Sequence, residues 1–115
     1  MNIAEIEKIT RDWNSATWAV IKLENPGIDR IRELFKDTYT LLDDLSKEKL
    51  VPKETSALLL EMNEFGWWLG NLPDAPLEYL YQEIFSLICK LNKYFLTRDA
   101  NTEEIERLIN ELNEC

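Results

Sequence analysis

The sequence contains no histidine, which removes the commonest general base, catalytic-triad member and transition-metal ligand. It also lacks a glycine-rich phosphate loop, a nucleophile elbow and the residue spacing of a calcium loop. Catalysis would have to rest on carboxylates, a cysteine, a lysine or a tyrosine. We therefore expect a binding protein rather than an enzyme, without a cofactor or a bound metal ion.

Cysteine is scarce as well, with Cys89 inside a helical pattern and Cys115 at the last position. Their spacing indicates neither a metal site nor a redox pair, so we expect two free thiols in a reducing compartment.

No apolar run approaches the ~18 residues of a membrane span. Glu5 and Glu7 stand where a secretory signal would carry positive charge. These features predict a cytoplasmic protein that does not enter a membrane.

Positively charged residues are few. Lysine and arginine number 13 against 22 aspartate and glutamate residues, which gives a formal net charge of -9 over 115 residues. Nucleic acid and anionic membrane are poor partners for such a chain, because their phosphates would be repelled. A basic protein is the natural counterpart. The alternative is that the acidity serves only to keep a small protein soluble.

Apolar residues recur every three or four positions in four long segments, 3–24, 28–47, 52–72 and 75–97, and in a short one after Asn101. The inward positions include Leu23 in the first segment and Phe85 in the fourth, which has the widest apolar arc. Trp18 falls off the first stripe. No period-two alternation indicates a strand. We expect an all-α protein, an up-and-down bundle of four main helices plus a short C-terminal helix, forming a single domain over 1–115.

Local signals mark where these helices begin and end. The tripeptide Asn25-Pro26-Gly27 should stop the first helix, and Pro52 suits the first turn of the third. Asp74 can cap the fourth helix, with Pro76 in its first turn. Asn101 is followed three positions later by a glutamate, as in a capping box.

The third helix has large apolar residues on two opposite sides, although a helix at the surface of a bundle should be polar on one of them. Its core stripe comprises Leu58, Met62, Phe65, Leu69 and Leu72. Trp67 and Leu60 point nearly the opposite way, Trp68 lies at the edge of the stripe, and Gly66 indicates close approach of a neighbouring helix. We favour burial of Trp67 and Leu60 as a second packed face. The alternative is an exposed aromatic anchor ringed by acidic and amide groups, as in a binding hot spot.

A magnesium enzyme is the leading alternative function. Small all-α nucleotide pyrophosphohydrolases hold magnesium with a Glu-x-x-Glu pair on one helix and a Glu-x-x-Asp pair on the next. Glu61 and Glu64 supply the first pair, and Glu78 begins the second, but Tyr81 stands where its aspartate should be. A regulatory or oligomerising helical module is the third hypothesis.

Residues 31–95 carry a resemblance to a known class of proteins. The shared features are a leucine-rich turn followed by Leu-Val-Pro-Lys-Glu at 50–54, an acidic helix with Glu61, Glu64 and Gly66, a Leu-x-x-Leu step at 69–72, and a buried leucine-rich helix. This pattern resembles the helical immunity proteins encoded beside bacterial polymorphic toxins and colicin-type nucleases.

The resemblance implies an antitoxin that neutralises a basic nuclease toxin by direct contact. Acidic groups would attract the toxin, and aromatic anchors would slow its release. The implied partner-binding residues are Glu61, Glu64, Trp67, Trp68, Asp74 and Glu78. For each carboxylate, the alternative is helix capping or plain solvation.

Overall fold

Five α-helices and one short 3-10 helix follow one another in the computed structural model, which describes residues 3–97 and 101–112. They are α1 (Ile3–Ile21), α2 (Ile28–Leu45), α3 (Glu54–Asn71), η1 (Glu78–Leu80), α4 (Tyr81–Thr97) and α5 (Thr102–Glu111). The all-α class, with four main helices and a short C-terminal one, is therefore confirmed. Cys115 lies outside the described residues.

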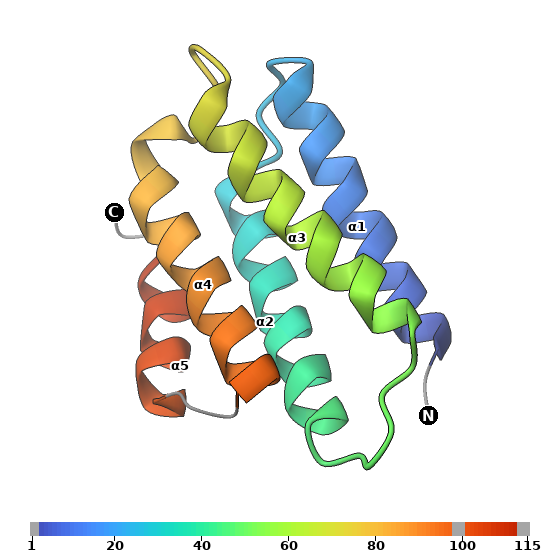
Figure 1. Cartoon of the computed structure of the whole chain (residues 1–115). Coiled ribbons are helices and arrows are strands. Elements are labelled where there is room, and N and C mark those ends of the chain that lie inside the picture. The colour runs from blue at the N-terminus through green and yellow to red at the C-terminus, as the bar shows by residue number, and fades with distance from the viewer. Residues whose placement is uncertain (1–2, 98–100, 113–115) are drawn as a thin grey trace.

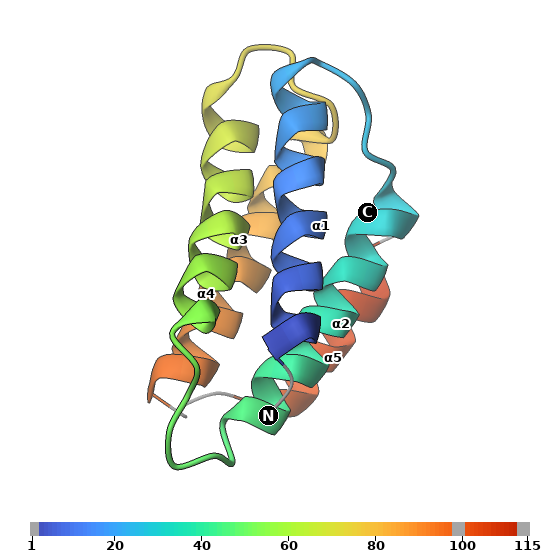
Figure 2. The same cartoon turned by 90° about the vertical axis from the view of Figure 1, so that its right-hand side faces the viewer.

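Successive helices alternate in direction, so α1, α3 and α5 run one way while α2 and α4 run the other (Figure 1). α3 lies between α1 and α4, with α2 behind this layer and α5 against α2 and α4, as the turned view also shows (Figure 2). α1 and α3 thus run in the same direction, and they form the most extensive helix pair of the bundle. The outward side of α3 lies on the surface of the molecule.

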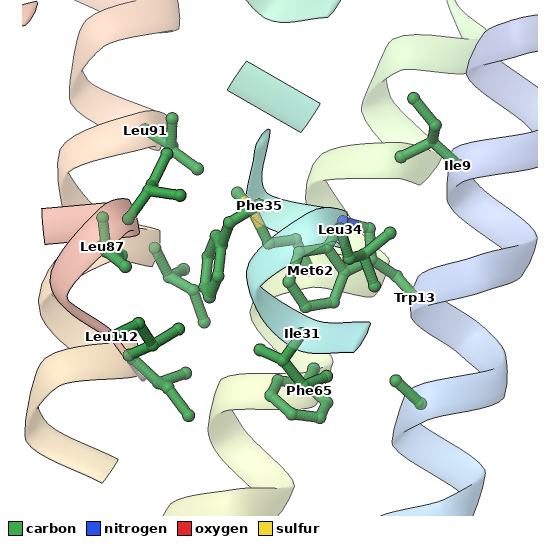
Figure 3. Packing of buried hydrophobic residues seen from close by; sticks show 14 of the residues in the cluster. Ile9, Trp13, Ile31, Leu34, Phe35, Met62, Phe65, Leu87, Leu91 and Leu112 are labelled. Atoms are coloured by element: carbon green, nitrogen blue, oxygen red, sulfur yellow. The ribbon is translucent and has the colours of Figure 1, made fainter. Parts of the chain in front are cut away.

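One continuous apolar cluster joins all five helices, and Figure 3 shows its side chains projecting into the space that they enclose. Trp13 of α1 is wholly buried in it, with its ring 5.1 Å from that of Phe35 and 5.4 Å from that of Phe65, measured between centroids. Its indole Nε1–H donates to the Thr38 hydroxyl over 2.9 Å, and that hydroxyl donates to the Leu34 carbonyl over 2.6 Å. The buried indole therefore has a hydrogen-bond acceptor, as a polar group inside a core requires.

The core stripe of the third helix is confirmed. Its first four members, Leu58, Met62, Phe65 and Leu69, are wholly buried, and Leu72 is half-buried. The close approach at Gly66 is confirmed too, because a Cβ added there would lie 2.7 Å from the Ile88 Cδ1 atom of α4. The Asn101 cap also holds, since its side-chain oxygen accepts from the Glu104 amide over 3.1 Å.

The first helix ends at Ile21, earlier than expected, and Leu23 does not point inward. Leu23 adopts a left-handed conformation with φ 58° and is 55% exposed. The Glu24 amide donates to the Ala19 carbonyl over 2.8 Å, and the Leu23 amide donates to that of Val20 over 2.9 Å. This bonding is the Schellman motif, in which the left-handed residue is usually glycine. Because leucine rarely occupies that position, the sequence did not reveal this helix end.

The fourth helix begins at Tyr81 rather than near 75, and the expectation that Asp74 caps it is wrong. Asp74 and Leu77 both have a left-handed backbone, with φ of 58° and 66°. Prolines at 73 and 76 disfavour helical geometry in the residue before each and lack an amide hydrogen. The segment forms short turns instead, in which the Glu78 amide donates to the Ala75 carbonyl over 3.1 Å.

The third helix begins at Glu54, so Pro52 lies just ahead of its first turn rather than within it. The Pro52 carbonyl accepts from the Thr55 amide over 3.0 Å, which forms a turn that leads into the helix. Glu54 places its negative charge in the first turn, where the dipole of the helix is positive.

Candidate functional site

The outward side of α3 carries large apolar side chains, and the expectation that they form a second buried face is wrong. Trp67 is 57% exposed and Leu60 is 61% exposed, while Trp68 is half-buried against the core. The helical period gives the direction in which a side chain points but not whether another helix lies there. α3 is flanked by α1 and α4, which leaves this side open to solvent (Figures 1 and 2).

A groove runs between this side of α3 and the start of α4, with a volume of about 500 Å³. Four aromatic rings, one leucine, two amides and one carboxylate line it: Leu60, Asn63, Glu64, Trp67, Trp68, Asn71, Tyr81 and Phe85. Phe85 was expected to be buried but is 48% exposed, because it lies at the rim of the apolar arc of α4. The groove therefore presents apolar and aromatic surface to solvent.

The four rings form two pairs on opposite helices. Trp67 and Trp68 of α3 meet edge to face, with centroids 5.1 Å apart, and Tyr81 and Phe85 of α4 lie 5.7 Å apart. The Tyr81 ring rests on Gly70 of α3, where a Cβ atom would overlap it. Gly70 thus allows the second aromatic pair to approach the helix that carries the first.

Side-chain amides form hydrogen bonds along the groove. Asn63 of α3 and Asn92 of α4 bond to each other reciprocally, over 2.9 and 3.3 Å, and so link the two helices. The Asn71 amide nitrogen donates to the Trp67 carbonyl over 2.7 Å. The Asn63–Asn92 pair helps to fix the spacing of α3 and α4, whereas the Asn71 bond stays within α3. The Glu64 carboxylate is the charged side chain of the groove lining.

A second hollow of about 330 Å³ adjoins the groove and shares Tyr81 with it. It is lined by Gly70, Glu78, Tyr79, Tyr81, Gln82 and Glu83. The two hollows together have three glutamates in their linings and neither lysine nor arginine. The aromatic groove thus borders a hollow whose charged lining residues are all acidic.

The expected partner-binding residues divide into three groups. Trp67, Trp68 and Glu64 line the groove, and Glu78 lines the adjoining hollow. Two others lie elsewhere. Glu61 faces α1, where its carboxylate accepts from the Asn14 amide over 3.2 and 3.3 Å, and Asp74 is exposed in the turn after α3, outside both linings.

The sequence does not reveal the α4 side of the groove. Tyr81, Phe85 and Glu83 were not named as binding residues because the pairing of α3 with α4 is not visible in the periodicity of either helix alone. One signal was available. The apolar arc of the fourth segment covers about half of a helix, so its edges, where Phe85 lies, had to approach solvent.

The carboxylates of the magnesium hypothesis do not share one hollow. Glu61 bonds to Asn14 on the α1 side, Glu64 lines the groove on the α4 side, and Glu78 lines the adjoining hollow. Within the described ranges, no three aspartate, glutamate or cysteine side chains gather as a set of metal ligands. The pyrophosphohydrolase alternative stays a prediction.

Groups with shifted pKa values gather away from the groove, where α2, α4 and α5 meet. The Tyr94 hydroxyl donates to Asp43, and this bond, together with the charge of Lys47, holds the pKa of Asp43 below its ordinary value against the opposing effect of burial. Burial, and then the charge of Glu106, raises the pKa of Tyr39, whose ring lies 5.7 Å from that of Tyr94. This cluster joins three helices, so we assign it to stability rather than to binding.

In comparisons with known proteins, the chain has no significant match to a family model, a curated protein or a solved structure. The resemblance to helical immunity proteins therefore stays a prediction. In the described part of the chain, none of the helices combines the length and the apolar character that a membrane crossing requires.

Proposed function

We propose that the chain is a non-catalytic protein-binding module, an immunity protein that neutralises a basic, nuclease-type bacterial toxin by direct contact. The observation that carries the proposal is the groove between α3 and α4, in which Trp67, Leu60 and Phe85 are exposed together. Exposed apolar groups that share one hollow, rather than being scattered singly, are typical of an interaction site.

The charge around the groove favours a cationic partner. Glu64, Glu78 and Glu83 line the two hollows without any lysine or arginine, and the whole chain has a formal charge of -9. Complementary charge speeds diffusional encounter, and desolvated aromatic anchors then slow dissociation. The resemblance of residues 31–95 to immunity proteins supports the same class of partner. We place this function in the cytoplasm, where the exposed Cys89 thiol would stay reduced.

The test first asks whether a reading frame adjacent to the gene of this protein encodes a protein with a basic C-terminal domain, and then uses that domain as the binding partner. We expect a stable complex whose association rate falls steeply as salt rises, because the attraction is between exposed charges. Trp67→Ala should weaken binding by about 2 kcal/mol or more if the indole is an anchor. Surface plasmon resonance over a salt series measures both effects.

Trp18→Ala is the matched control. Trp18 lies on α1, is 52% exposed and does not line the groove, so its removal should leave the affinity unchanged. Absence of a complex, a salt-independent association rate, or equal losses in the two tryptophan variants would each contradict the proposal.

A further inference from the structure

The chemistry of the groove indicates which side chain of a basic partner enters it. Trp67 and Trp68 form one aromatic pair, and Tyr81 and Phe85 form the other. All four rings line the groove. The face of an aromatic ring attracts a cation, most strongly for tryptophan, and in proteins the cation is more often arginine than lysine. The groove is therefore suited to a flat, cationic group.

Hydrogen-bond acceptors accompany the rings. The Glu64 carboxylate lines the groove, and so does Asn71, whose amide nitrogen is used on the Trp67 carbonyl while its side-chain oxygen is an acceptor. A guanidinium presents five N–H donors in a rigid planar fork and is more weakly hydrated than an ammonium. It can stack on a ring and donate sideways to a carboxylate at the same time, whereas a lysine ammonium is a compact and strongly hydrated point charge.

We propose that the groove binds an arginine side chain of the partner, with the guanidinium plane against Trp67 and its N–H groups directed to Glu64. This inference rests on the proposed function, since it assumes that the partner is a basic protein. A second copy of the chain is disfavoured as the occupant by its net charge of -9. Nucleic acid bases also stack on aromatic rings, but Glu64, Glu78 and Glu83 would repel their phosphates.

The experiment compares two peptides of equal length and charge, hexa-arginine and hexa-lysine, by isothermal titration calorimetry at fixed salt. If the negative charge of the protein alone attracted them, the two peptides would bind with equal affinity. We expect hexa-arginine to bind wild type about five- to tenfold more tightly. Trp67→Ala should abolish this preference, and Trp18→Ala should retain it.

A charge-matched pair of variants tests the carboxylate. Glu64→Gln should weaken binding of hexa-arginine by about threefold. Glu7→Gln removes the same charge from α1, outside the groove lining, and should have a smaller effect. Because Glu64 and Trp67 are exposed, neither change removes core packing, and circular dichroism checks that each variant is folded.

Equal affinity for the two peptides, no binding of either, or a preference for arginine that survives Trp67→Ala would overturn the inference. Failure of the proposed function has a different signature, because it is read from the toxin domain. If the toxin domain binds through Trp67 while the peptides bind equally, only the arginine assignment fails. If the toxin domain does not bind, the proposed function fails whatever the peptides do.

Discussion

Ile88 of α4 packs against Gly66 of α3 so closely that a Cβ atom on the glycine would come within 2.7 Å of the Ile88 Cδ1 atom. Ile88 is buried, so its end cannot move freely into solvent. The contact is where α3 and α4 approach each other, and the same approach forms the groove.

Gly66→Ala should therefore destabilise the fold despite the better helix propensity of alanine. Overpacking costs about 1–3 kcal/mol, whereas replacing a glycine inside a helix gains up to about 1 kcal/mol. We expect a net loss of about 1 kcal/mol in the free energy of unfolding. Urea denaturation followed by circular dichroism measures it.

The double variant separates these two effects. Ile88→Val removes the clashing methyl group and by itself should cost about 1 kcal/mol. In the Gly66→Ala background it should cost less than that, or stabilise, because the two changes are coupled. Strictly additive losses would show that the contact is not tight.

Leu23→Gly should stabilise the protein. Leucine in the left-handed region with φ 58° carries backbone strain that glycine avoids, and the exposed side chain contributes little burial. We expect a gain of about 0.5–1 kcal/mol in the free energy of unfolding. Leu60→Gly is the control, because Leu60 is similarly exposed but lies inside α3. That change should cost about 1 kcal/mol, and a loss in both variants would contradict the assigned role of Leu23.

Thr38→Val should destabilise the core by about 1–3 kcal/mol, because the Trp13 indole N–H would be left buried without an acceptor. The replacement has nearly the same shape, so packing changes little. Thr17→Val is the control, since the Thr17 hydroxyl donates only to the Trp13 backbone carbonyl, over 3.0 Å. It should cost less than Thr38→Val in chemical denaturation, and equal costs would indicate that the indole bond contributes little.

Tyr94→Phe should raise the pKa of Asp43 toward its ordinary value, because the hydroxyl that bonds to the carboxylate is lost. A carboxyl whose pKa is lowered by folding contributes stability above its unfolded pKa, and this contribution is lost as pH falls through the folded pKa. The variant should therefore lose less stability on acidification than wild type does.

Carbon-13 NMR titration of the Asp43 carboxyl measures the pKa directly, and urea midpoints at neutral and acid pH measure the stability. Tyr79→Phe is the control, because Tyr79 is exposed in the hollow beside the groove and lies outside the Asp43 cluster. An unchanged pKa in the Tyr94 variant would contradict the assignment.

The helices could be predicted from the sequence because apolar residues recur along each of them every three or four positions. Phe65 and Leu69 are both buried as their spacing requires, and Asn101 caps α5 as its chemistry predicts. The end of α1 and the start of α4 were not predictable in this way. Leu23 adopts a conformation that leucine usually avoids, and Asp74 has the residue type of a cap but lies between two prolines that force turns.

The candidate site was only half predictable, because it belongs to a pair of helices rather than to one. The period of α3 placed Trp67 away from the core, but whether a neighbour covers that side depends on how α1 and α4 pack around it. Phe85 and Trp67 line the same groove because α4 packs on α3, through contacts such as that of Ile88 with Gly66, which join residues far apart in the chain. Such tertiary pairings leave no trace in local periodicity.

Because α1 packs mainly on α3, the core cannot be completed until late in synthesis of the chain. Asn14 of α1 bonds to Glu61 of α3, which lies 47 positions later. The contacts between α1 and α3 can therefore form only after most of α3 has emerged from the ribosome. A hairpin of α1 and α2 alone leaves the side of Trp13 that meets Phe65 uncovered. A nascent chain halted before α3 thus offers chaperones and proteases an indole that the finished protein hides.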